Sequence, residues 1–381
     1  MTFNESCLGP AIDDRTAAMN DDARFMALAL ALGRRGLGRT WPNPAVGAVI
    51  VKDGTIVGRG WTQAGGRPHA EIEALRRAGA SAHGATMYVT LEPCSHHGKS
   101  PPCADAVIAA GISRVVSALE DPNPEVAGAG HQRLRAAGVV VAVGIGAEEA
   151  RHDHAGHIRR MRDGRPHVML KLAISADGKA GGFGRRPIAI TGEAVRERVH
   201  LMRAQSDAVM IGVGTVLADD PLLTCRLPGM AKNSPVRIVL DSALRLALGS
   251  RLVQTARETP VWVIAAADAP HLAGEPLRAQ GVEVLGAETS AAGLLDLAAV
   301  LKLLAVRGIT RLMVEGGPTL AAALIAADLV DEAMLFHSAK IAGADGIEAL
   351  DGPAMTALFG RLKLMTDVPV GPDRQHLYQR R

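Results

Sequence analysis

Short apolar runs alternate with segments of helical periodicity along this 381-residue chain, and the alternation begins twice. The first series opens with AVGAVIVKDGTIVGRGW and ends with VVVAVG, whereas the second opens with HVMLKLAIS. Strands that alternate with helices favour a mostly parallel sheet covered by helices on both faces. Because a chain of this length is long for a single hydrophobic core, the pattern predicts two α/β domains.

Composition and local sequence divide the chain into four segments. Residues 1–20 are polar and are expected to form a flexible tail, which ends where Asn20 can cap a helix. Residues 21–147 are assigned to the first domain and residues 167–381 to the second. Between them, residues 148–166 are charged, rich in His and closed by Gly and Pro, so we expect a connecting helix and a linker there.

The overall composition argues against several classes of protein. The formal net charge is only +3 and no run of Lys or Arg forms a stripe, so a nucleic-acid partner is not expected. No apolar run is long enough to span a membrane, and the polar N-terminus does not look like a signal peptide. Four cysteines in a chain of this size do not form a disulfide framework. We therefore expect a cytoplasmic protein with a small-molecule partner and no membrane partner.

The first domain carries a set of residues that suits a catalytic zinc site. His69 and Glu71 lie two positions apart at the predicted start of a helix. Cys94 follows a strand directly after a proline, and Cys103 starts the next helix. One imidazole and two thiolates suit zinc, and three protein ligands leave a fourth position open for water. A nearby Glu can then carry protons between that water and a leaving amine.

The order of these residues resembles the deaminase pattern H-x-E followed by P-C-x-x-C, although here eight residues separate the two cysteines. Other interpretations remain open. Taken singly, His69 could be a surface histidine and both cysteines buried apolar residues. A structural zinc site would add a fourth ligand, for which His96 or His97 could serve, and would not need Glu71. A deaminase of nucleosides or tRNA, with a non-catalytic second domain, would normally show the shorter cysteine spacing.

Further polar residues of the first domain could contact a substrate. The insertion between the cysteines carries His96 and Lys99, which could hold a ribose or a phosphate, or could simply be solvated. Asn43 lies between two prolines at the start of the first strand, where it could bind the edge of a base or serve as a turn residue.

The second domain gives weaker signals, since it has no complete G-x-G-x-x-G fingerprint. In RLMVEGGPTLAAALI, a strand leads through Gly316 and Gly317 to Pro318 at a helix start. Free backbone N–H groups at such a turn can hold a phosphate, although an ordinary strand-to-helix turn would look the same. The loop TVLADDPLLTCR brings Asp219 and Arg226 close in sequence, as a ligand-binding loop or a solvated one would.

Both halves of the chain resemble the RibD family of bifunctional riboflavin biosynthesis proteins. The deaminase half of that family is similar to HAEIEAL, VTLEPCSHHGKSPPCADAVIAAGISRVV and DPNPEVAGAG, and the long cysteine spacing is typical of it. Its reductase half is similar to LKLAISADGK, MRAQSDAVMIGVGTVLADDPLLTCR, VEGGPTLAAALI and DLVDEAMLFHSAKIAG. The resemblance implies an α/β chain with a cytidine-deaminase-like α/β/α zinc domain followed by a dihydrofolate-reductase-like α/β domain.

The resemblance also implies two consecutive activities, a hydrolase and an oxidoreductase. The first is zinc-dependent hydrolytic deamination of 2,5-diamino-6-ribosylamino-4(3H)-pyrimidinone 5′-phosphate. The second is NADPH-dependent reduction of the ribosyl group, which gives 5-amino-6-ribitylamino-uracil 5′-phosphate. The implied cofactors are one Zn²⁺ per chain and NADPH, and the implied assembly is a homo-oligomer, a dimer or a tetramer.

Site residues follow from the resemblance by their positions in the matching motifs. The implied zinc ligands are His69, Cys94 and Cys103, with Glu71 as the catalytic proton carrier. The implied contacts of NADPH are Ala173, Thr215, Asp219, Gly317, Pro318, Thr319 and Leu320. The implied contacts of the substrate are Asn43, His96, Lys99, Asp121, Asn123, Arg203, Leu223, Arg226 and Glu315. One motif departs from the family: a Ser-x-Trp that usually precedes Ile-Thr is replaced here by Pro187 and Ala189.

Overall fold

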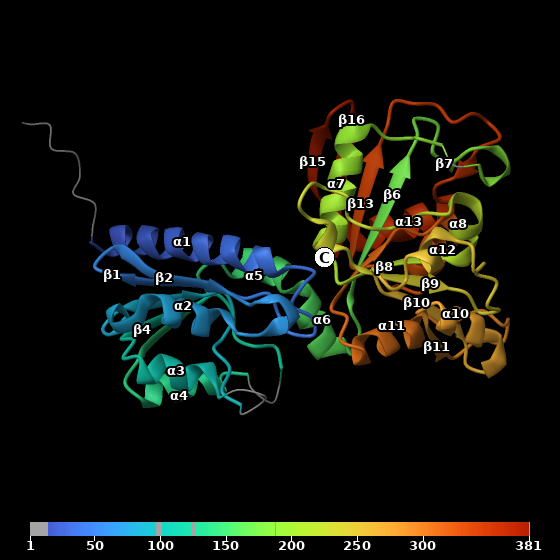
Figure 1. Cartoon of the computed structure of the whole chain (residues 1–381). Helices are drawn as coiled ribbons and strands as arrows, with labels where there is room; N and C mark the ends of the chain where they lie inside the picture. The colour runs from blue at the N-terminus through green and yellow to red at the C-terminus, as the bar shows by residue number, and fades with distance from the viewer. Residues whose placement is uncertain (1–13, 97–100, 124–126, 187, 381) are drawn as a thin grey trace, which may run out of the picture. The chain divides into compact units, whose positions relative to one another are not determined.

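The computed structural model describes residues 14–96, 101–123, 127–186 and 188–380 of the chain (Figure 1). Contacts divide the chain into two compact units. Unit 1 comprises Met1–Gly36 and Ala45–His154, and unit 2 comprises Leu37–Pro44 and Ala155–Arg381. The segment expected to be a linker holds two helices, α5 (Ala147–Asp153) in unit 1 and α6 (Ala155–Asp163) in unit 2. Within the described ranges, no helix is both long and apolar enough to cross a membrane.

Unit 1 is built on a five-stranded sheet with the order β2-β1-β3-β4-β5. Its strands are β1 (Gly47–Lys52), β2 (Thr55–Trp61), β3 (Thr86–Val89), β4 (Arg114–Ser117) and β5 (Val140–Val143). The sheet is parallel from β3 to β5, whereas β1 runs antiparallel to both of its neighbours. Strands β1 and β2 form a hairpin. Asp53 and Gly54 form its turn with φ values of 49° and 73°, which suit a two-residue turn between twisted strands.

Helices cover both faces of this sheet. Figure 1 shows α1 and α5 on one side and α2, α3 and α4 on the other. The bounds are α1 (Asp14–Gly33), α2 (Ala70–Ala78), α3 (Cys103–Ala109) and α4 (Ala129–Ala136). The cytidine-deaminase-like three-layer architecture expected from the sequence is therefore confirmed for this unit.

The predicted tail is too long. Helix α1 begins at Asp14, so Asn20 lies inside it and is not its N-cap. The helix propensity of Asn is only a fraction of a kcal/mol below that of good helix formers, and α1 continues through it. Residues 1–13 of the predicted tail lie outside the described residues.

Unit 2 contains a nine-stranded sheet with the order β11-β10-β9-β8-β12-β6-β13-β16-β15. Its strands are β6 (His167–Ile174), β8 (Ala208–Gly212), β9 (Val236–Leu240), β10 (Val261–Ala266), β11 (Glu283–Ala287), β12 (Arg311–Val314), β13 (Glu332–His337), β15 (Leu362–Val370) and β16 (Asp373–Arg380). The sheet is parallel from β11 to β13, and β16 is antiparallel to both β13 and β15. A small separate sheet pairs β7 (Lys179–Gly181) with β14 (Ile347–Glu348).

Alternate residues of the parallel strands enter different hydrophobic clusters, as expected for a sheet covered on both faces. One cluster joins Leu170 and Met210 to side chains of helices α11, α12 and α13. The others join Val209 to α8, α9 and α10, and Met313 to α7. The helices are α7 (Glu193–Ala204), α8 (Val213–Asp219), α9 (Arg251–Gln254), α10 (Glu275–Ala279), α11 (Leu297–Val306), α12 (Pro318–Ala326) and α13 (Gly352–Arg361).

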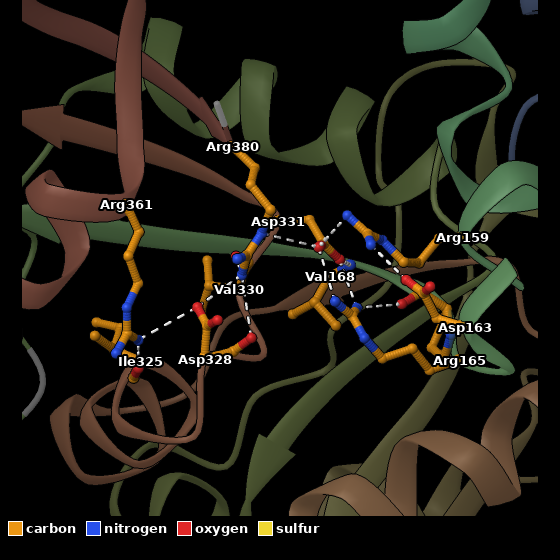
Figure 2. Close-up of polar contacts among 11 residues, drawn as sticks. Arg159, Asp163, Arg165, Val168, Ile325, Asp328, Val330, Asp331, Arg361 and Arg380 are labelled. Atoms are coloured by element: carbon orange, nitrogen blue, oxygen red, sulfur yellow. Dashed lines mark hydrogen bonds and ion pairs between the residues drawn. The ribbon is translucent and has the colours of Figure 1, made fainter.

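A buried carboxylate holds the start of unit 2 in place. The side chain of Asp331, only 2% exposed, accepts hydrogen bonds from both terminal nitrogens of Arg165 at 2.6 and 2.9 Å. It also accepts from the backbone N–H of Val168 at 3.0 Å and pairs with Arg159 of α6 at 2.9 Å (Figure 2). Asp331, which directly precedes β13, thereby anchors helix α6 and the start of β6.

Candidate active sites

In unit 1 the three expected metal ligands converge. His69 is the N-cap of α2, in an extended conformation, and Cys103 is the first residue of α3. The Nδ1 atom of His69 lies 3.7 Å from Sγ of Cys94 and 3.3 Å from Sγ of Cys103. All three donor atoms lie within 4.8 Å of one another. One imidazole nitrogen and two sulfurs at this spacing fit a zinc ion with a further position open to solvent or substrate.

Local electrostatics favour a thiolate at Cys94. A hydrogen bond from the Cys103 thiol lowers the pKa of Cys94 to about 4, with His69 and the backbone N–H of Cys103 acting in the same direction. That N–H donates to Sγ of Cys94 across 3.3 Å from the first turn of α3. A helix N-terminus stabilises negative charge, so the fold itself supports a sulfur ligand at this position.

Glu71 lies in the first turn of α2 and is 3% exposed. Burial raises the pKa of its carboxyl group, and the nearby positive charge of His69 opposes that shift. Its carboxylate also hydrogen-bonds with the side chain of Cys103. A buried carboxyl group beside a metal site is placed to exchange protons with a reacting water or amine.

The other described residues expected in the deaminase site lie outside helices and strands. His96 is exposed, and Lys99 lies outside the described residues. Asp121 and Asn123 follow β4, and Oδ1 of Asp121 accepts a hydrogen bond from the backbone N–H of Asn123 at 2.9 Å. Asn43 belongs to the Leu37–Pro44 segment, whose contacts group it with unit 2, so its expected contact with a base stays a prediction.

In unit 2 the expected residues gather at the carboxyl edge of three neighbouring parallel strands, β8, β12 and β6. Ala173 is near the end of β6, Thr215 lies in α8 directly after β8, and Glu315 follows β12. Ligands of open α/β sheets bind at this edge, because the loops that follow the strands surround it.

Arg203 and Glu315 are joined in this region. The side chains of both are nearly buried, 11% and 8% exposed, with Nε of Arg203 2.6 Å from Oε1 of Glu315. Another N–H of Arg203 donates to the carbonyl oxygen of Thr224 at 3.2 Å. Burial alone would raise the pKa of Glu315, but Arg203 outweighs that effect and holds the pKa below its ordinary value. Arg203 therefore holds a carboxylate here, whereas the exposed Arg226 is more available to a phosphate.

Lys171 was missed in the sequence analysis. It lies on β6 directly after Leu170, which pairs with Val314 in the β6–β12 ladder, and burial lowers the pKa of its ammonium group while Glu315 opposes the shift. A lysine in the middle of the apolar run VMLKLAI was a usable signal, since Lys is rarely placed in a buried strand without a partner.

The turn that starts α12 fits a phosphate of a dinucleotide. Gly317 is the N-cap and no side chain caps the helix. A Cβ atom placed at Gly317 would lie 3.7 Å from Oγ1 of Thr215, an ordinary contact distance, so a longer side chain here would extend along Thr215. Pro318, Thr319 and Leu320 form the first turn. Pro318 has no N–H and that of Leu320 donates to the carbonyl oxygen of Gly317 at 3.1 Å, so the N–H of Thr319 and the helix dipole are what favour an anion here. A helix start without a side-chain cap, next to Thr215, is compatible with a phosphate of NADPH.

The loop after α8 completes this edge of unit 2. Asp219 is exposed at the end of α8, and partial burial raises the pKa of its carboxyl group. Leu223 is 3% exposed and adopts a positive φ of 55°, which is strained for this residue type. Arg237, fully buried on β9, donates to the carbonyl oxygen of Leu222 at 3.3 Å and so supports the strained position.

The motif that departs from the family follows β7 in the chain. Pro187 is outside the described residues, and Ala189 is exposed, with its carbonyl oxygen accepting a hydrogen bond from Lys340 at 2.7 Å. An alanine provides no aromatic surface for stacking at this position.

Two family descriptions match the two halves of the chain. Residues 19–119 match the zinc-binding region of cytidine and deoxycytidylate deaminases. Residues 166–374 match the RibD C-terminal domain. The chain is 44% identical over 365 residues to riboflavin biosynthesis protein RibD of Escherichia coli (strain K12), covering 92% of this chain and 97% of that protein. It is 42% identical over 322 residues to the Aquifex aeolicus (strain VF5) protein of the same name, covering 84% and 88%.

Solved structures agree with these matches. The structure of Acinetobacter baumannii RibD, form 1, is similar with a TM-score of 0.85 and 36% identity, covering 95% of this chain and 99% of that one. A diaminohydroxyphosphoribosylaminopyrimidine deaminase/5-amino-6-(5-phosphoribosylamino)uracil reductase from Thermotoga maritima is similar with a TM-score of 0.83 and 34% identity, covering 96% and 100%. The similarity therefore extends over both units.

Proposed function

Because this chain belongs to the RibD family of bifunctional riboflavin biosynthesis enzymes, we propose that its two units act in turn on one ribosyl phosphate. As a member of this family, the chain is a zinc-binding deaminase and an NADPH-dependent reductase. In our proposal unit 1 deaminates 2,5-diamino-6-ribosylamino-4(3H)-pyrimidinone 5′-phosphate. Unit 2 then reduces the ribosyl group and yields 5-amino-6-ribitylamino-uracil 5′-phosphate. The convergence of His69, Cys94 and Cys103 next to Glu71 carries the first step.

The residues of unit 1 divide the work of deamination. His69, Cys94 and Cys103 would hold zinc, which when bound makes water available as a nucleophile near neutral pH. Glu71 takes a proton from the attacking water and returns it to the leaving amine, since its buried carboxyl group adjoins the ligand cluster. Asp121, Asn123, His96, Lys99 and Asn43 are proposed to bind the base and its ribosyl phosphate.

The residues of unit 2 position two ligands for hydride transfer. The α12 turn and Thr215 would hold phosphate groups of NADPH, with Ala173 and Asp219 beside them, and the cofactor supplies the hydride. Glu315, fixed by Arg203 and close to Lys171 in register, faces the ribosyl group in this proposal. Leu223 and Arg226 would contact the substrate from the loop that Arg237 supports.

Two other interpretations are not favoured. A nucleoside or tRNA deaminase with a non-catalytic second domain does not account for the match of residues 166–374 to the RibD C-terminal domain. A zinc-stabilised binding protein does not account for the burial of Glu71 beside the ligands. We further propose that the enzyme acts in the cytoplasm as a homo-oligomer without a nucleic-acid partner. Sedimentation of the purified zinc-loaded protein would test the oligomeric state.

A single time course tests the proposed order of reactions. Zinc-loaded protein is given the diaminopyrimidine ribosyl phosphate and NADPH, and ammonia release and NADPH oxidation are followed together. We expect ammonia first and NADPH oxidation after a lag, since the second unit acts on the product of the first. Ammonia release without NADPH oxidation would instead indicate that replacement of the usual Ser-x-Trp around Ala189 has cost the second activity.

A further inference from the structure

Glu92 is a buried carboxylate that neither the ligand set nor the expected substrate contacts include. It lies two residues before Cys94, and its side chain is 2% exposed. Three backbone N–H groups donate to it. Those of Asp121 and Gly128 reach Oε2 at 3.0 Å each, and that of His131 reaches Oε1 at 3.1 Å. A buried charge is costly unless it is hydrogen-bonded, so these contacts form a specific arrangement.

The nearest side chain of opposite potential charge does not neutralise Glu92. Nδ1 of His131 lies 3.8 Å from Oε2, but burial lowers the pKa of this imidazole and favours its neutral form. The carboxylate is therefore balanced mainly by backbone dipoles, including those at the start of α4. Its function must then lie in ordering the backbone that surrounds it.

That backbone packs directly against the residues next to the zinc ligand. A Cβ atom at Gly130 would lie 2.1 Å from the carbonyl oxygen of Pro93 and 3.0 Å from Oε1 of Glu92, so only glycine fits. On the other side of Pro93, the carbonyl oxygen of Cys94 accepts a hydrogen bond from the N–H of Ala104 at 3.1 Å. Glu92 and Pro93 thus contact both the segment that carries the metal ligand Cys94 and the chain after β4.

The described parts of that chain, residues 121–123 and 127–131, carry two expected substrate contacts. The N–H of Asp121 donates to Glu92, and Oδ1 of Asp121 in turn accepts from the N–H of Asn123 at 2.9 Å. The carbonyl oxygen of Asn123 then accepts from Ala127 at 2.9 Å, just before Gly128 returns to Glu92. The backbone that carries both residues is therefore hydrogen-bonded, directly or through Asp121, to the Glu92 carboxylate.

We propose that Glu92 is a positioning residue for deamination: it fixes Asp121 and Asn123 relative to Cys94 without touching substrate or metal. This inference rests on the proposed deaminase function of unit 1. It predicts that loss of the carboxylate weakens substrate binding while zinc stays bound. Glu92, Glu120 and His131 also form a group that could hold a cation, but the three N–H groups on the Glu92 oxygens leave little capacity for one.

The test compares E92Q and E92A with a matched control, E120Q, which removes an exposed carboxylate next to the same segment. For each full-length zinc-loaded variant we would measure zinc content, KM and kcat for ammonia release, and NADPH oxidation with the deaminated product. We expect the KM for deamination to rise about tenfold in E92Q, which corresponds to about 1.4 kcal/mol. The rise should be larger in E92A, which removes all three acceptor contacts, and E120Q should match wild type.

In E92Q, zinc content and the reductase rate should stay within about twofold of wild type, a ratio that corresponds to about 0.4 kcal/mol. Amide hydrogen exchange should quicken at Asp121, Gly128 and His131 and not along α2. An unchanged KM in E92Q, or a loss of zinc that parallels the loss of activity, would overturn the proposal. If E92A does not fold, E92Q decides. Absence of ammonia release from wild type would refute the deaminase function itself and is distinguishable from both results.

Discussion

Arg203 of helix α7 holds Glu315, the residue after β12, through two parallel hydrogen bonds of 2.6 and 2.9 Å. The fork of a guanidinium matches a carboxylate in this way, and the low exposure of both side chains strengthens the pairing. The pair fixes Glu315 beside the edge where Ala173 and Thr215 also lie. Arg203 is thus committed to a carboxylate that we place against the substrate.

The Arg203–Glu315 pair predicts how stability depends on pH. The pKa of Glu315 is lower in the folded protein than its ordinary value of 4.5. Its ion pair therefore contributes stability that is fully present above that value and is lost as pH falls through the folded pKa. We expect E315Q to lower the free energy of unfolding at neutral pH by about 3 kcal/mol. Urea unfolding at a series of pH values should show this difference shrinking in acid; a difference that is constant with pH would contradict the account.

The position of Gly317 beside Thr215 predicts an effect on the cofactor. The φ of −68° suits any residue, so G317V should fold, but the branched side chain would extend along Thr215, where we propose that a phosphate binds. We expect the KM for NADPH to rise by roughly tenfold or more, the ratio for about 1.4 kcal/mol, with ammonia release unchanged. The matched control is G352V, at the start of α13, where a Cβ would meet no atom within 4 Å. Equal effects of both variants would count against the α12 turn as the cofactor site.

The carboxylates of Figure 2 predict two different costs of removing a charge. Asp331 is 2% exposed and accepts from Arg165 and Val168, whereas Asp328 pairs with Arg380 and is 51% exposed. Breaking a buried pair costs about 3–5 kcal/mol, and an exposed pair contributes less than about 1 kcal/mol. We expect D331N to destabilise the reductase unit by the larger amount and D328N by the smaller. The two variants would be heated to a series of temperatures and cooled, and the remaining rate of NADPH oxidation would show which one loses its reductase unit at the lower temperature.

The features that the sequence predicted well are local. The start of α2 after His69 and the start of α12 at Pro318 each depend on a few adjacent residues whose backbone preferences agree. The zinc ligands could be found for the same reason, because His69 and Cys103 lie at helix starts and Cys94 lies in the loop that follows β3. The chemical types of the residues then sufficed to suggest a metal.

The features that the sequence did not predict depend on distant partners. Glu92 is defined by N–H groups that lie 29 to 39 positions away, and no local pattern shows them. The grouping of Asn43 with unit 2 reflects contacts such as the edge-to-face packing of Trp41 on Trp262. The sheet of unit 1 is parallel only from β3 to β5, because a hairpin supplies its other edge. Lys171 alone left a local trace that could have been used.

Removal of zinc should separate the two activities. The ligands belong to unit 1, so a chelator should abolish ammonia release and leave NADPH oxidation with deaminated product within about twofold of the untreated rate. Addition of zinc should restore ammonia release. Parallel loss of both activities, with the fold of unit 2 retained by circular dichroism, would contradict the assignment of the metal to deamination alone.

The measurement that tests the account most directly is the E71Q variant, which keeps the shape of Glu71 but removes its ability to exchange protons. We predict that E71Q binds as much zinc as wild type and that its rate of ammonia release falls by about 10²-fold or more. NADPH oxidation with the deaminated product should be unchanged. An E71Q protein that releases ammonia at the wild-type rate with zinc bound would show that Glu71 is not the proton carrier and that the central claim is wrong.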